Sequence, residues 1–274
     1  PAIARASAIS LLPRYLDQST FGAIQKGLED DDAKVRLASI GALEGLQPAM
    51  LVQLVFPLLD DPVRSVRIEA ARVLAPVPVG ELQGEQLSIY RNAADEYIAS
   101  QTVNAERPEA QLNLANYFVA RGEAAKAEAA LNKAIELDDV FVPAYVNLAD
   151  VYRMQGNDAE AYRVLSTAKQ LAPDNADVRH ALGLVMVRQN KTEQAVAELE
   201  AATRLAKDNV RYIYVYAVAL NSTGKPKDAI EQLQIAHDRF PQNVEVLQAL
   251  VSFNRDAGNA FTAERYMKKL EELK

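Results

Sequence analysis

Apolar residues recur along the second part of the chain with a period of 34 residues, without insertion or deletion from Pro108 onward. Each unit has an alanine, and a large apolar residue follows it four positions later. Another small or apolar residue comes three positions after that. These spacings place the side chains on one face of an α-helix, and the small residues let two helices approach closely. The alanines are Ala127, Ala161, Ala195, Ala229 and Ala263, and the large residues are Leu131, Leu165, Leu199, Leu233 and Met267.

A turn residue separates the two halves of every unit. Glycine and asparagine can adopt the left-handed backbone conformation that ends a helix, so the pattern predicts five helix hairpins. The run from Tyr212 to Tyr216 alternates like a β-strand, but its register predicts the first helix of the fourth hairpin. The turn residues are Gly122, Gly156, Asn190, Gly224 and Gly258.

The 34-residue pattern resembles the tetratricopeptide repeat (TPR), which asks for a large residue, Leu-Gly, Tyr, Ala, Leu, Ala and Pro at set positions. Asp139 and Lys207 stand where the pattern has its terminal proline, and Asn254 stands at an aromatic position. The resemblance implies an all-α fold, an α-solenoid in which antiparallel helix hairpins form a right-handed superhelix. The second unit matches best, through Tyr145, Leu148, Ala149, Tyr152, Gly156, Ala161, Leu165, Ala168 and Pro173.

The first part of the chain has a period of 31 residues. The segments that begin at Val35-Arg36 and Val66-Arg67 share a pattern, and a third copy begins at Ala4-Arg5. They resemble short HEAT repeats. The first copy is without a preceding helix, so we expect the natural chain to continue upstream of Pro1. We also expect Ile9, Leu11 and Leu12 to be partly open and to support weak self-association through the N-terminal helix.

These patterns predict three parts. Residues 1–80 form HEAT-like helical repeats, of which the first is truncated. Residues 81–107 form a connector and the long helix of a degenerate repeat. Residues 108–274 form five TPR units. Two prolines between residues 75 and 80 interrupt helix formation, and residues 86–105 are helical in pattern.

Composition excludes several functions. The chain has no cysteine, so it offers no disulfide, thiolate nucleophile or Cys-ligated metal. Its net charge of -7 provides no basic excess for nucleic acid or anionic lipid. No apolar run approaches the length of about 18 residues that a membrane-spanning helix needs. We therefore expect no nucleic-acid partner and no membrane insertion.

Residues suited to catalysis are sparse. The two histidines, His180 and His237, are far apart in the sequence, and the pattern places both on repeat helices. The acidic residues 29–32 could suggest calcium, but an aspartate at a helix start more often accepts backbone N–H bonds. We therefore predict that the protein is not an enzyme and has no cofactor or metal.

The remaining candidate is the concave surface that the first helices of TPR arrays share. Asn113 and Asn147, one repeat apart, could bond a peptide backbone, while arginines could pair with carboxylates. The family's chaperone-tail carboxylate clamp is not expected, because Leu112, Asp177 and Ala181 replace its basic residues. The predicted partner-binding residues are Asn113, Asn116, Asn147, Asp150, Arg153, His180, Arg188, Arg211, Tyr214, Asn221 and Arg255.

The sequence thus predicts a non-catalytic scaffold that binds a peptide or protein in the concave TPR groove. A second interpretation uses the order of HEAT-like and TPR units, which is similar to the C-terminal region of bacterial multihaem c-type cytochrome proteins. It would make this chain a docking or assembly arm of a larger extracytoplasmic redox enzyme. The location would be periplasmic if that resemblance holds and cytoplasmic otherwise.

Overall fold

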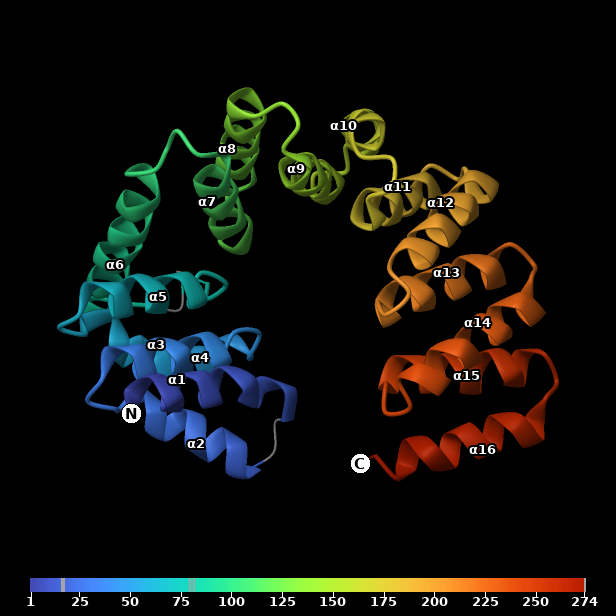
Figure 1. The fold of residues 1–274 in the computed structure, drawn as a ribbon, viewed down its shortest axis with the longest axis horizontal. Helices are drawn as coiled ribbons and strands as arrows, with labels where there is room; N and C mark the ends of the chain where they lie inside the picture. Colours follow the sequence, from blue (N-terminus) through green and yellow to red (C-terminus); the bar gives the residue numbers. More distant parts are fainter. Residues whose placement is uncertain (16–17, 79, 81, 274) are drawn as a thin grey trace. The chain divides into compact units, whose positions relative to one another are not determined.

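The structure is a computed structural model that describes residues 1–15, 18–78, 80 and 82–273. Every regular element among these residues is helical, with sixteen α-helices and two 3-10 helices, which confirms the all-α prediction (Figure 1). The chain divides into two compact units, Pro1–Asp139 and Val140–Lys274. The division falls after the first predicted TPR unit rather than at the change of repeat period near residue 107.

Three helices of the first unit, α1, α3 and α5, begin 31 residues apart. Helix α3 packs against both α1 and α5, so the equivalent helices of successive copies are direct neighbours. Its elements are α1 (Ala2–Leu11), η1 (Leu12–Tyr15), α2 (Gln18–Leu28), α3 (Ala33–Ala42), α4 (Pro48–Val55), η2 (Phe56–Asp60), α5 (Arg64–Val73), α6 (Glu85–Thr102), α7 (Pro108–Ala120) and α8 (Ala124–Leu137).

An arginine at the same position of each copy forms an ion pair, with the next acidic turn in the first two copies and with helix α6 in the third. The guanidinium of Arg5 donates to both carboxylate oxygens of Asp30, at 2.9 and 2.8 Å. Arg36 makes the same bidentate contact with Asp61 at 2.8 and 2.9 Å, but here both side chains are buried. The third copy follows the pattern with Arg67 and Glu96. The first two ion pairs join a helix to a turn 25 residues later, and the third joins α5 to α6.

Carboxylates of the acidic turns accept hydrogen bonds both from backbone N–H groups and from these arginines. The carboxylate of Asp32 accepts a hydrogen bond from the backbone N–H of Lys34 and caps α3, as predicted. Asp61 accepts from the backbone N–H of Val63, just before α5, as well as from Arg36. A negative group at a helix start satisfies N–H groups that have no partner within the helix.

The N-terminal helix is less open than the sequence predicts. Ile9 is buried rather than open, because it packs beside Gly27, where a side chain on the glycine would collide with its Cδ1. Leu12 is half-buried, whereas Ile3 and Leu11 are exposed. The apolar surface available on α1 therefore comes from Ile3 and Leu11. Self-association through it stays a prediction.

The second unit is a series of antiparallel helix hairpins (Figure 1). The first helix of each hairpin packs against its own second helix, which then packs against the first helix of the next hairpin. The unit contains α9 (Val142–Met154), α10 (Asp158–Leu171), α11 (Ala176–Arg188), α12 (Thr192–Leu205), α13 (Val210–Ser222), α14 (Pro226–Arg239), α15 (Val244–Asp256) and α16 (Ala260–Glu271). The strand-like run from Tyr212 to Tyr216 lies inside α13, as its register predicts.

The predicted turn residues have the left-handed conformation. Gly156, Gly224 and Gly258 have φ values of 76°, 77° and 78°, and Gly122 in the first unit has 71°. Asn190 has a φ of 58° and is the only non-glycine residue with a positive φ among those that the structure describes. Asparagine tolerates this region better than most residues with a side chain. The five turn residues therefore share one backbone conformation.

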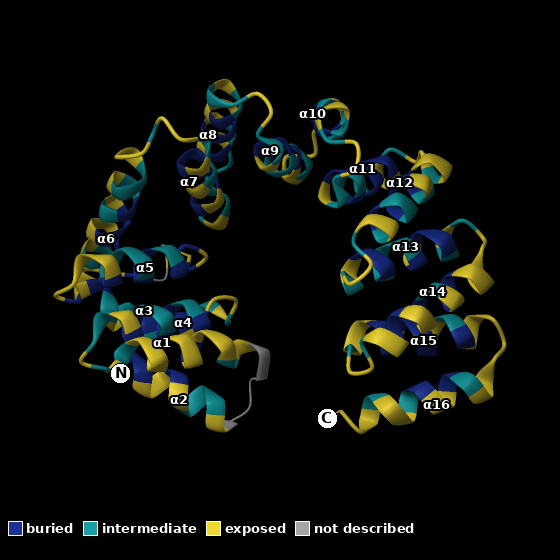
Figure 2. Cartoon of the chain, in the orientation of Figure 1, coloured by how far each residue is buried: buried dark blue, intermediate teal, exposed yellow. Residues whose placement is uncertain are grey.

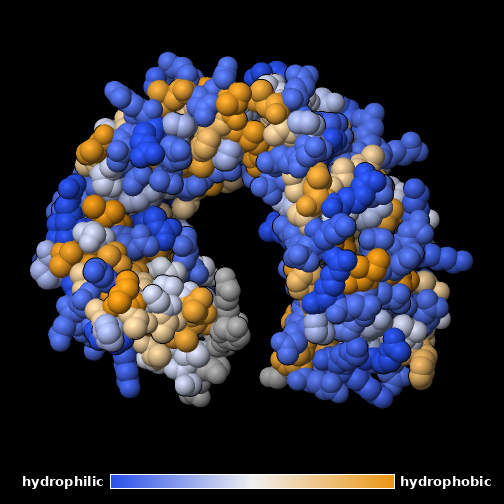
Figure 3. Space-filling view, viewed as in Figure 1, coloured by the Kyte–Doolittle hydropathy of each residue, from blue (hydrophilic) through white to orange (hydrophobic). Residues whose placement is uncertain are grey.

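The periodic alanines and leucines form the contacts inside the hairpins, where buried residues face one another (Figure 2). Ala195 is fully buried and Leu199 is 1% exposed. Gly183 of α11 lies so close to α12 that an added Cβ would be 2.6 Å from Cγ of Leu199. The outward positions are polar, and hydrophilic residues cover much of the face of the second unit seen in Figure 3.

Candidate partner-binding pocket

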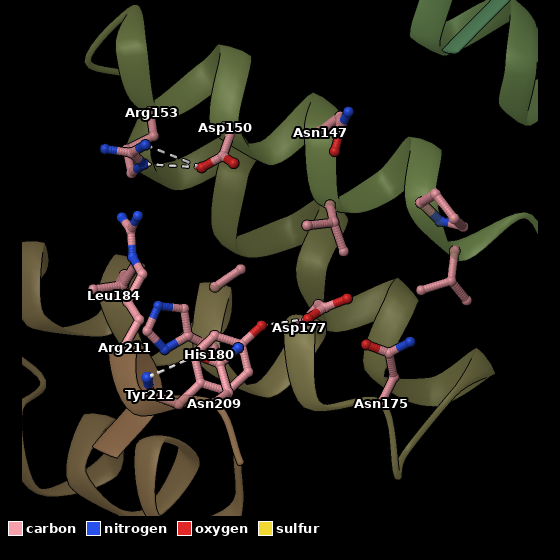
Figure 4. Close-up of a pocket in the computed structure, with 14 residues that line it drawn as sticks. Asn147, Asp150, Arg153, Asn175, Asp177, His180, Leu184, Asn209, Arg211 and Tyr212 are labelled. Carbon is pink, nitrogen blue, oxygen red and sulfur yellow. Dashed lines mark hydrogen bonds and ion pairs between the residues drawn. The ribbon is translucent and has the colours of Figure 1, made fainter. Parts of the chain in front are cut away.

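The first helices of three successive hairpins in the second unit line one pocket of about 460 Å³ (Figure 4). It brings together five of the eleven residues that the sequence predicts: Asn147, Asp150, Arg153, His180 and Arg211. Helix α9 supplies the first three, α11 supplies His180 and α13 supplies Arg211. The other lining residues are Val142, Pro143, Val146, Asn175, Asp177, Ala181, Leu184, Asn209 and Tyr212.

Two asparagines at the pocket are held by the backbone. The side chain of Asn175 accepts a hydrogen bond from the N–H of Val178, and that of Asn209 accepts one from the N–H of Tyr212. They cap α11 and α13 and are 34 residues apart, and Asn243 repeats the arrangement at α15. The caps orient the first turn of each helix, and that turn carries Asp177 and Arg211.

Two of the four charged side chains that line the pocket form an ion pair with each other, and the other two do not. Arg153 donates to Asp150 on the same helix at 3.1 Å. Asp177 accepts a hydrogen bond from the hydroxyl of Tyr212, which crosses from α13 to α11. Arg211 is exposed, and no ion pair joins it to a carboxylate among the residues that the structure describes. The pocket therefore contains one ion pair, Arg153 with Asp150, one carboxylate that accepts from a hydroxyl, and one guanidinium outside an ion pair.

His180 lines the pocket, but most of its side chain is buried. Its ring stacks on that of Tyr212, with centroids 4.2 Å apart and planes 20° apart. Burial, and then the nearby positive charge of Arg211, lower the pKa of His180 to about 4, so the ring is neutral at pH 7. Its Nδ1 is buried without a hydrogen-bond partner.

The other predicted groove residues of the second unit lie outside this pocket. Tyr214 and Asn221 line a second depression of about 530 Å³ between α13 and α15, together with Phe253. Arg255 lines a third, between α15 and α16, and its guanidinium lies 3.3 Å from the sulfur of Met267. Arg188 forms an ion pair with Asp158 at 2.6 Å.

Asn113 and Asn116 belong to the first unit, where they line a smaller pocket of about 180 Å³ with Tyr97 and Tyr117. The amide of Asn113 donates to the side chain of Gln101 at 3.1 Å. Asn113 and Asn147 thus lie in different units, and their hydrogen bonding to one peptide backbone stays a prediction.

Sequence reasoning did not select Asp177 and Tyr212 as pocket residues. Both occur in the first turn after a capping asparagine, and recognition of that repeated cap could have indicated them. His237, in contrast, lies away from the pocket. It is buried between α14 and α16, with its Nε2 2.8 Å from Nζ of Lys269 and its ring edge against Tyr266.

Two further features are absent from the described ranges, a metal-binding cluster and a membrane-spanning helix. No three or more His, Asp or Glu side chains are grouped there so that they could hold a metal ion. None of the described helices combines the length and apolar character needed to cross a bilayer.

The stacked hairpins and their shared first-helix surface define an α-solenoid built from helical repeats. Family models of the tetratricopeptide repeat match residues 108–140, 142–208 and 180–244. The chain therefore carries tetratricopeptide repeats over these ranges, as the 34-residue pattern predicts. None of these three matches covers the first 107 residues, so the HEAT-like resemblance of that part stays a prediction.

Solved structures support the same fold at low sequence identity. MamA 41-end from Desulfovibrio magneticus RS-1 is 20% identical with a TM-score of 0.54, over 61% of this chain and 94% of that one. YrrB, described as a TPR protein with an unusual peptide-binding site, is 22% identical with a TM-score of 0.51, over 64% and 91%. PilF of Pseudomonas aeruginosa is 20% identical with a TM-score of 0.56, over 62% and 77%.

No curated protein matches the chain closely enough to count as a relative. None of these three structures is described as a multihaem cytochrome, so that resemblance gains no support from them.

Proposed function

We propose that the protein is a non-catalytic scaffold and that the pocket between α9, α11 and α13 binds an extended segment of a protein partner. The observation that carries the proposal is the convergence of polar side chains from three successive repeats on one open pocket. Amides, guanidiniums and a tyrosine ring offer hydrogen bonds and contact area to a peptide backbone and its side chains.

The similarity of the fold to a solved structure described as having a peptide-binding site supports this proposal. YrrB shares the fold, and its description as a TPR protein with a peptide-binding site indicates that such an array can hold a peptide. In this chain, α13 contributes to both the first pocket and the second depression, so a segment bound in one can continue into the other. A few anchor contacts would provide most of the affinity.

The proposal is tested by selecting binding peptides from a displayed random library on the full chain and then measuring their affinity. Asn147→Ala and Arg153→Ala should each weaken a selected peptide by about 5- to 30-fold if they are anchors. Arg163→Ala is the matched control, because Arg163 pairs with Glu160 three residues away on the second helix of the same hairpin, outside the pocket. Equal effects of Arg153→Ala and Arg163→Ala would place the binding surface elsewhere.

A further inference from the structure

We propose that the pocket between α9, α11 and α13 selects an acidic side chain of the bound segment, anchored by Arg211 and His180. This inference rests on the proposed function and specifies the chemistry of its partner. It follows from the charge pairing inside the pocket, from the state of the histidine and from the continuity with the second depression.

Among the described residues, two charged groups of the pocket lie outside an ion pair, Arg211 and Asp177. Asp150 is held by Arg153, and Asp177 is held by the hydroxyl of Tyr212. Arg211 has no such carboxylate partner within the described part of the chain, and Figure 4 shows its guanidinium extending from α13 toward Arg153 of α9. A carboxylate between the two guanidiniums would relieve their repulsion and could accept parallel hydrogen bonds, for which guanidinium geometry is suited.

His180 supplies a second donor. A buried N–H group without an acceptor is costly, so the unpartnered Nδ1 favours the tautomer with its proton on Nε2. The ring lines the pocket and is held by its stack on Tyr212, so its position is set before a ligand arrives. A neutral imidazole of this kind can donate one hydrogen bond to a carboxylate.

The surroundings favour a peptide carboxylate over a small free anion. The same helix α13 leads from the pocket to the second depression, where Tyr214, Val218 and Phe253 offer aromatic and apolar surface. Arg211 at the pocket and Val218 at the depression are seven residues apart on α13, so they lie about 10 Å apart along the helix axis, which corresponds to about three residues of extended chain. The expected segment therefore has Asp or Glu in the first pocket and an apolar or aromatic residue about three positions away.

Peptides from the displayed library provide the test, and sequencing them comes first. We expect enrichment of Asp or Glu about three positions from an apolar residue. A selected peptide and its amide version, with Asp changed to Asn or Glu to Gln, are then compared on the wild type and on Arg211→Met. The wild type should prefer the acidic peptide by at least 10-fold, and Arg211→Met should reduce that preference to about 2-fold or less.

Two variants separate specific from general effects. Arg204→Met removes an exposed arginine from the second helix α12, outside the pocket, and should leave the preference unchanged. Arg211→Glu should reverse the selection toward Lys or Arg. Far-UV circular dichroism of each variant confirms that the repeats remain folded.

The outcomes distinguish the two levels of the proposal. Peptide binding that is sensitive to Arg153→Ala but has no acidic preference would overturn the anchor and leave the scaffold function standing. Selection of basic peptides by the wild type would also overturn it, because Asp150 and Asp177 would then be the anchors. A complete lack of peptide binding would overturn the scaffold function and the anchor together.

Discussion

The ion pair between Arg36 and Asp61 provides a sharp test of how the first unit is held together. The two side chains are 10% and 5% exposed, and the guanidinium also donates to the backbone carbonyls of Asp30 and Asp31 at 2.8 and 3.1 Å. Arg36→Met keeps much of the apolar stem and removes the guanidinium. Among the described residues, it leaves the buried Asp61 carboxylate with the N–H of Val63 as its remaining donor.

The expected cost is large because a buried charge loses its partner. Breaking such a pair typically reduces the free energy of unfolding by about 3 kcal/mol or more. Burial raises the pKa of Asp61, but hydrogen bonds from Arg36 and Val63 outweigh it and hold that pKa below its usual value. A carboxylate of this kind stabilises the fold above its unfolded-state pKa, and the contribution disappears as pH falls through the folded value. At pH 7 the full contribution is therefore present.

Arg5→Met is the matched control. Arg5 makes the same two-pronged contact with Asp30, over the same 25-residue separation, but its side chain is 52% exposed. Solvent screens an exposed pair and rehydrates the partner that is left, so the loss should be clearly smaller.

Urea unfolding at pH 7, followed by circular dichroism, measures both variants. Asp61→Asn and the double variant with Arg36→Met complete a cycle that isolates the energy of the pair. Equal losses for Arg36→Met and Arg5→Met would refute the reasoning, because burial would then make no difference to the two contacts.

Three further predictions concern the second unit. Lowering the pH from 7 to 5 should cost about 1 to 2 kcal/mol through His180, because its folded pKa of about 4 lies below the ordinary 6.5 and the unfolded chain binds the extra proton. His180→Phe should lack this part of the pH dependence in urea unfolding. Gly156→Ala should cost about 1 kcal/mol in the same assay, because φ is 76° there, whereas Asn190→Gly should be neutral or stabilising. Gly183→Ala should lower the thermal midpoint, because its Cβ would overlap Leu199, and an unchanged midpoint would show that α11 and α12 separate without cost.

Much of the fold could be predicted from the sequence because repeat signals are local. The alanine and leucine period predicts the hairpins, and the glycines at the turns predict their conformation, since few other residues adopt positive φ. The repeat register also predicts a helix for the strand-like run in α13, because the same positions of the four other units are helical in pattern.

The candidate site could be predicted only in part. First-helix register selects five of the residues that line the pocket, Asn147, Asp150, Arg153, His180 and Arg211. It could not show that Arg188 is engaged by Asp158. Ion pairing depends on which side chains meet across neighbouring helices, and one helix's periodicity carries no information about its neighbour.

The sequence by itself determined the helical repeats, their turns, the capping aspartate and the surface on which to seek a partner. Those features depend on backbone conformation and on spacing along one chain segment. Only the tertiary structure decided that Ile9 and His180 are buried, that Arg36 pairs inside the fold and that Arg211 is left without a counter-ion. These properties depend on contacts between helices that are distant in sequence. Such contacts decide which side chains are buried and which charges are paired.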